Sequence, residues 1–157
     1  MLKGALFILF LLVFYQDLKL RAVHWVLFPL VFVGSIFYTL DGFRLEELGA
    51  NVLFLLMLLG CLTIYLSLRQ GSLVNITKGF FSWGDILFLL AIVPLFNFTS
   101  FMLFFTVGTF LTVLVHLIAR LFWKQEATIP FAGYMSLFTG LYLLFQSLFE
   151  PFTYLFA

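Results

Sequence analysis

The sequence predicts an all-α integral membrane protein with about six transmembrane helices and with both chain ends outside. The 157 residues are 64% hydrophobic, 21% aromatic and only 10% charged, and the mean hydropathy is +1.20. Soluble domains carry about 25% charged residues, so this composition excludes an ordinary soluble fold. Polar breaks divide the apolar residues into stretches near the ~20 residues that cross a bilayer.

Six apolar stretches alternate with these breaks. They are Leu2–Leu20, Ala22–Leu40, Gly49–Leu68, Gly79–Phe98, Phe101–Phe122 and Ile129–Phe149. Asp41-Gly42 is a turn signal after the second stretch, because glycine accepts positive φ and aspartate bonds nearby backbone. Asn97–Ser100 predicts a tight connection before the fifth stretch, and Lys124–Thr128 predicts a polar one before Pro130. We therefore expect a single membrane-embedded domain over residues 1–157.

The basic residues predict the orientation. If the amino terminus is outside, the external side holds two basic residues, Lys3 and Arg44, and the cytoplasmic connections hold six: Lys19, Arg21, Arg69, Lys78, Arg120 and Lys124. Cytoplasmic loops carry such an excess of lysine and arginine. The three tryptophans support this orientation, because aromatic rings favour the interface and all three fall near the inner boundary: Trp25, Trp83 and Trp123.

Two acids lie inside the apolar stretches at similar predicted depth. Asp17 comes four residues before Arg21, and Asp85 comes seven residues after Lys78. At the helical rise per residue, these spacings put the carboxylates about 6 and 10 Å inside the cytoplasmic interface. A charge in hydrocarbon is costly, so both acids are candidate functional residues. Neighbouring packing of the first and fourth helices would bring them together.

The residues around both acids resemble the signatures of the prepilin peptidase family. Asp17–Val23 is similar to the family's Asp-x-(Lys/Arg)-x-x-x-(Ile/Val) motif, Ser82–Asp85 to its Gly-x-Gly-Asp motif, and Ile129–Ala132 to a proline-containing stretch before its last helix. The resemblance covers most of the chain. It implies an aspartic endopeptidase of a bacterial or archaeal cytoplasmic membrane. Its substrate would be a leader-bearing pilin-like precursor, cut at the cytoplasmic face, and its catalytic pair would be Asp17 and Asp85.

Three positions depart from the family pattern. Ser82 stands where the family has the first glycine, Leu87 where a lysine is common, and His24-Trp25 where Pro-Asn is usual. These differences affect how a substrate would be placed at the site and which subgroup of the family the chain resembles. The chain resembles the short, peptidase-only form, so no methyl-donor cofactor is expected. Cys61 is the only cysteine and no zinc-ligand pattern is present, so we expect neither a metal nor a cofactor. Membrane lipid is an expected partner, and nucleic acid is not.

The chemistry of an aspartate pair sets further expectations. Two carboxyl groups held close share a proton, so that one acts as base and the other as acid. A helix start favours the charged form of Asp85, which makes Asp17 the predicted proton holder, although Lys19 and Arg21 oppose this assignment. Gly84 has a predicted supporting role, because its missing Cβ lets a substrate backbone approach Asp85. Ordinary packing of a small residue between helices is the alternative.

Two other functions remain compatible with the sequence. A proton- or cation-coupled transporter would also keep acids in its membrane helices. A catalytically silent scaffold related to the peptidases would account for Ser82 and Leu87. The retained acids favour the endopeptidase.

Overall fold

The fold is all-helical in every regular element of the residues that the computed structural model describes, which are 2–42, 44–71, 82–122 and 129–155. The α-helices are α1 (Leu2–Leu20), α2 (Leu27–Tyr38), α3 (Leu45–Gln70), α4 (Trp83–Ile92), α5 (Phe98–Phe122) and α6 (Phe131–Leu155), and two short 3₁₀ helices are η1 (Leu40–Gly42) and η3 (Val93–Leu95). The predicted all-α class is therefore confirmed.

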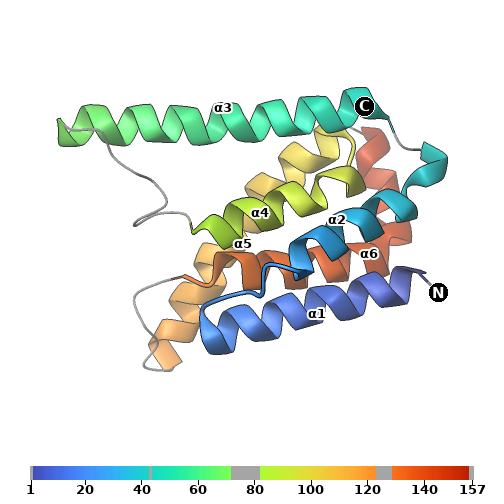
Figure 1. The fold of residues 1–157 in the computed structure, drawn as a ribbon, viewed down its shortest axis with the longest axis horizontal. Helices are drawn as coiled ribbons and strands as arrows, with labels where there is room; N and C mark the ends of the chain where they lie inside the picture. The colour runs from blue at the N-terminus through green and yellow to red at the C-terminus, as the bar shows by residue number, and fades with distance from the viewer. Residues whose placement is uncertain (1, 43, 72–81, 123–128, 156–157) are drawn as a thin grey trace.

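Successive α-helices run in alternating directions, so that the beginning of α1 and the end of α6 lie at the same end of the bundle (Figure 1). The most extensive interface joins α1 to α6, and α2 packs against α1 and α4. The third helix is more peripheral. It contacts mainly α5 and η3, and its carboxy-terminal half extends away from the other helices (Figure 1).

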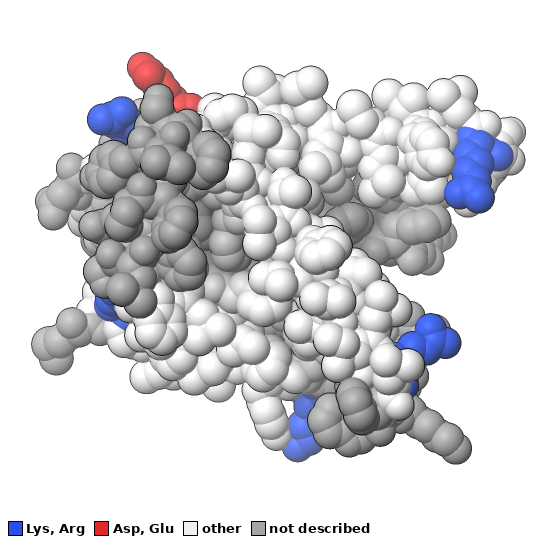
Figure 2. Space-filling view, turned by 180° about the vertical axis from the view of Figure 1, so that it is seen from behind, with Lys and Arg blue, Asp and Glu red and all other residues white. Residues whose placement is uncertain are grey.

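Within the described residues, two helices are long and apolar enough to cross a membrane, namely the 26-residue α3 and Phe98–Leu121 of α5. Three shorter apolar helices cover Leu27–Tyr38, Trp83–Leu95 and Phe131–Phe145. Charged side chains on the face in Figure 2 lie toward the two ends of the molecule, with uncharged surface between them. These features support membrane association, whereas six complete spans remain a prediction.

Two helices are shorter than the sequence predicted. The stretch Ala22–Leu40 contains helix only from Leu27. The chain turns at Arg21, whose φ is 53°, and residues 22–26 connect α1 to α2. The expected fourth helix, Gly79–Phe98, begins at Trp83 after the cap residue Ser82. It becomes 3₁₀ at η3, which contains Pro94, since proline has no N–H to continue an α-helix.

The predicted breaks around α5 and α6 have different outcomes. A tight connection is present, but it is shorter than the predicted Asn97–Ser100, because α5 begins at Phe98. Oδ1 of Asn97 accepts a hydrogen bond from the Ser100 N–H at 2.8 Å in the first turn of α5. The sixth helix begins at Phe131, directly after Pro130, and contains a kink at Phe145. The predicted positions Lys78, Trp123 and Lys124 lie outside the described residues.

The α1–α6 interface depends on the absence of a side chain at Gly140. A Cβ there would lie 3.1 Å from Cδ2 of Phe7 and 3.6 Å from Cβ of Phe10. Phe10 is fully buried, and its ring meets the edge of the Phe88 ring with centroids 6.2 Å apart. Close approach at Gly140 therefore brings α1 and α6 together and seats Phe10 against α4.

Replacing Gly140 with leucine tests this packing. Overpacking of a filled interior costs about 1–3 kcal/mol, so we expect Gly140→Leu to lower the thermal unfolding temperature in detergent micelles. Gly60→Leu is the matched control, because a Cβ at Gly60 meets no atom within 4 Å. An equal loss of stability in the two variants would contradict the role assigned to Gly140.

Candidate active site

Asp85 lies at the start of α4 and is held by two neighbouring segments. Its Oδ2 accepts hydrogen bonds from the backbone N–H and the hydroxyl of Ser82, both at 2.8 Å. The Ser82 hydroxyl in turn accepts from the Asp85 N–H at 3.1 Å, which completes a capping box. The other oxygen, Oδ1, accepts from the Ala132 N–H of α6 at 2.9 Å. The Asp85 side chain is only 7% exposed.

Asp17 lies in the last turn of α1 and is bound by the next residue of α6. Its Oδ2 accepts a 2.6 Å hydrogen bond from the Gly133 N–H, and the side chain is 8% exposed. Asp85 and Asp17 therefore accept hydrogen bonds from two successive backbone N–H groups, those of Ala132 and Gly133, at the start of α6. The structure brings together the two acids that the sequence singled out, although 67 positions separate them in the chain.

The start of α6 is suited to hold these carboxylates. The first N–H groups of a helix have no partner within the helix and carry the positive end of its dipole. Here the Phe131 N–H bonds to the Ile129 carbonyl at 2.9 Å, and the Tyr134 N–H bonds to the Pro130 carbonyl at 3.1 Å. The two N–H groups between them point to the aspartates, so every donor of this first turn is used.

A close approach occurs at Gly133. A Cβ added there would lie 3.0 Å from Oδ2 and 3.1 Å from Cβ of Asp17. At Gly84 the nearest atoms to an added Cβ are Oγ of Ser82 at 3.5 Å and Cζ of Phe28 at 3.7 Å, which are ordinary contacts. Packing within the chain therefore does not require glycine at position 84. The predicted role of Gly84 toward a substrate stays a prediction.

Charged neighbours act on the pair. Asp17 interacts electrostatically with Asp85 and with the Arg21 guanidinium. Arg21 thus contributes to the site directly, beyond its predicted role in orientation. A positive charge beside the pair offsets part of the repulsion between two carboxyl groups.

Sequence reasoning missed two parts of this site. The backbone amides of Ala132 and Gly133 carry no side-chain signal, although a proline such as Pro130 is common at a helix start. Ser82, noted only as a departure from a family motif, is a direct hydrogen-bond partner of Asp85. Its hydroxyl therefore positions the carboxylate.

The two histidines of the chain are His24, in the connection from α1 to α2, and His116, in α5. His24 is exposed, and its ring stacks on Trp25 with centroids 6.4 Å apart. His116 is 4% exposed in α5, and its Nδ1 has no hydrogen-bond partner in the part of the chain that the structure describes. Within the same residues, no group of three histidine, cysteine or acidic side chains is arranged to hold a metal ion.

Comparison of the chain with protein-family models, with curated proteins and with solved structures gave no match.

Gly133→Ala provides a direct test of the contact with Asp17. We expect it to lower the thermal unfolding temperature, because Asp17 must move and weaken a buried hydrogen bond, which is worth about 0.5–1.5 kcal/mol. Gly84→Ala should leave the unfolding temperature nearly unchanged, because its Cβ fits. Equal stability of Gly133→Ala and the parent would mean that Asp17 does not depend on this close approach.

Ser82→Ala tests the cap that positions Asp85. Loss of the N-cap hydroxyl costs about 1 kcal/mol, whereas glycine at an N-cap costs only a few tenths. We therefore expect Ser82→Ala to lower the free energy of unfolding more than Ser82→Gly, measured by denaturant titration. The reverse order would show that the hydroxyl does not stabilise the start of α4.

Proposed function

We propose that this protein is a membrane-embedded aspartic endopeptidase of the prepilin peptidase type, which cleaves the leader of a pilin-like precursor at the cytoplasmic membrane face. One observation carries the proposal: two buried carboxylates, Asp17 and Asp85, accept hydrogen bonds from successive backbone amides. Aspartic proteolysis uses two such groups at close range. The motif resemblance around both acids supports the same activity.

Helix capping explains only half of this arrangement. Asp85 completes a capping box with Ser82, a common stabilising role for an acid at this position. Asp17 has no such role in its own helix, because it lies near the carboxy-terminal end of α1, where the helix dipole disfavours a negative charge. A second buried acid beside the first adds repulsion. A catalytic use for the pair accounts for an arrangement that stability alone does not favour.

The proposed topology has six spans with both chain ends outside. Lys19, Arg69 and Arg120 lie in the last turns of α1, α3 and α5, and these three helices end on the same side of the bundle (Figure 1). Asp17 and the start of α4 lie toward that side. Trp25 and Trp83, which are 69% and 67% exposed, flank it as interfacial side chains. The aspartates would then face the cytoplasmic leaflet.

Hydrolysis at this pair requires one charged and one protonated carboxyl. The charged carboxylate takes a proton from water, whose oxygen attacks the scissile carbonyl, and the protonated carboxyl donates its proton to the carbonyl oxygen. Collapse of the tetrahedral intermediate breaks the C–N bond. The leaving amine receives a proton from the acid that took one from water, and a hydroxyl of the intermediate returns its proton to the carboxyl that had protonated the carbonyl oxygen. The two carboxyls exchange roles, and no net proton is consumed at the site.

The hydrogen bonds support Asp85 as the charged member of the pair. Asp85 accepts three hydrogen bonds, from the Ser82 N–H, the Ser82 hydroxyl and the Ala132 N–H. The Gly133 N–H bonds only one oxygen of Asp17, which leaves Oδ1 to carry the proton. Hydrogen bonds donated to a carboxylate favour its charged form. Arg21 acts in the opposite direction on Asp17, and we assign the proton to Asp17 on the larger number of donors at Asp85.

Asp17→Asn and Asp85→Asn test the proposed catalysis. Each variant should reduce leader cleavage at least about a hundredfold, because acid–base catalysis contributes about 10²–10⁴-fold and both groups are needed. Asparagine keeps the size and one acceptor oxygen, so both variants should still insert in the membrane. The measurement is the processing of a co-expressed precursor that carries a basic leader, followed by gel mobility.

Glu46→Gln is the matched control, because Glu46 is an exposed acid in the first turn of α3 and should not affect cleavage. Unchanged cleavage in both aspartate variants would overturn the mechanism. Absence of cleavage by the parent would favour the silent scaffold. Proton or cation uptake by parent vesicles that disappears in the aspartate variants would favour the transporter.

A further inference from the structure

A second polar site lies at the other end of the bundle from the aspartates. It is a pocket of about 610 Å³ bounded by the end of α2, the start of α3 and the connection from η3 to α5. The proposed catalytic function does not use it. Of the described residues, eleven line it: Tyr38, Thr39, Gly42, Arg44, Glu47, Leu48, Val93, Pro94, Leu95, Phe96 and Asn97.

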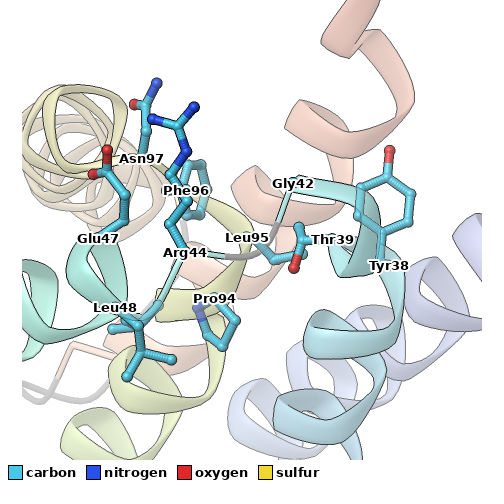
Figure 3. A pocket seen from close by; sticks show the side chains of 11 residues that line it. Tyr38, Thr39, Gly42, Arg44, Glu47, Leu48, Pro94, Leu95, Phe96 and Asn97 are labelled. Atoms are coloured by element: carbon cyan, nitrogen blue, oxygen red, sulfur yellow. The ribbon is translucent and has the colours of Figure 1, made fainter.

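The lining combines one cation and one carboxylate with an apolar floor. Arg44 and Glu47 extend toward the same side of the pocket, with Asn97 beside them, while Leu48 and Pro94 lie below (Figure 3). The Arg44 guanidinium makes no hydrogen bond or ion pair with any residue that the structure describes. Arg44 is also one of the two basic residues that the proposed topology leaves outside. Its charge is therefore available to a ligand.

The wall that carries these groups is held in place by two hydrogen bonds between segments that are distant in the chain. Oε2 of Glu47 accepts from the Phe98 N–H at 2.7 Å, which caps the start of α5. Nδ2 of Asn51, a fully buried residue, donates to the Phe96 carbonyl at 2.9 Å. These bonds join α3 to the η3–α5 connection. The carboxylate and its neighbours are thus positioned before a ligand arrives, which reduces the entropic cost of binding.

We propose that this pocket binds the headgroup of a phospholipid that carries a primary ammonium, as in phosphatidylethanolamine. The Arg44 guanidinium would pair with the phosphate, which suits its forked donors. The ammonium would donate to Oε1 of Glu47 and to Oδ1 of Asn97. The apolar floor from Leu48 and Pro94 would contact the glycerol and the first acyl carbons.

The balance of charge selects this ligand class. A purely anionic headgroup would pair with Arg44 but would be repelled by the Glu47 carboxylate. A purely cationic ligand would pair with Glu47 but would be repelled by the Arg44 guanidinium. A quaternary ammonium has no N–H to donate to the carboxylate. The inference rests on the proposed membrane embedding and not on the proposed peptidase activity.

Lipid-dependent stability tests the site. The full chain in detergent would be heated with dioleoyl-phosphatidylethanolamine, dioleoyl-phosphatidylcholine or dioleoyl-phosphatidylglycerol at equal mole fraction. We expect the ethanolamine lipid to raise the unfolding temperature most. Arg44→Gln and Glu47→Gln should each weaken its apparent affinity about tenfold, the effect of losing one charge-assisted hydrogen bond. The glutamine at position 47 can still accept the Phe98 N–H, so the α5 cap is retained.

Lys3→Gln is the matched control, because it removes the other basic residue assigned to this side, which does not line the pocket. It should keep the full preference for the ethanolamine lipid. Equal stabilisation by the three lipids, or an unchanged preference in Arg44→Gln, would overturn the proposal. Leader cleavage measured in parallel separates the two ideas: a parent that prefers this lipid but cuts no leader retains the lipid site and loses the peptidase.

Discussion

The hydrogen bonds from the Ala132 and Gly133 amides to the two aspartates are the interaction on which the rest of the structure depends. They join three helices, α1, α4 and α6, that are distant in the chain. They also satisfy two N–H groups that would otherwise be buried without partners at a helix start. The same contacts offset the cost of placing two acids in an apolar interior, because each carboxyl group gains a hydrogen bond from a backbone N–H, and the bond to the charged Asp85 is charge-assisted.

Small residues make this arrangement possible. Gly133 lets α6 approach Asp17, and seven residues later Gly140 lets it approach Phe7 and Phe10. Both glycines lie on the side of α6 that meets α1, and this interface is the most extensive in the bundle. Such small-residue contacts are a common means of association for apolar helices, since van der Waals packing replaces the hydrophobic effect within a membrane. The same face of α6 therefore packs against α1 and positions Asp17.

The two ends of the bundle differ in chemistry. At one end the two carboxyl groups are buried, bonded to backbone amides and adjacent to each other, which suits proton transfer. At the other end Arg44 and Glu47 border an open pocket and are separated, which suits recognition of a ligand with two opposite charges. Alternation of the helices produces this division, because each connection returns the chain to the opposite end (Figure 1).

The sequence by itself determined the helical class and the first helix from Leu2 to Leu20, and it identified the two acids as an unusual pair. These features follow from composition and hydropathy, which can be read along the chain without knowing how the helices pack. The sequence predicted α2 and α4 too long, since the turn at Arg21 and the cap at Ser82 depend on backbone geometry that hydropathy does not encode. Only the tertiary structure decided that the acids meet, and that Ala132 and Gly133 hold them. A backbone amide carries no residue-specific signal, and which amide faces a carboxylate depends on how α6 packs against α1 and α4.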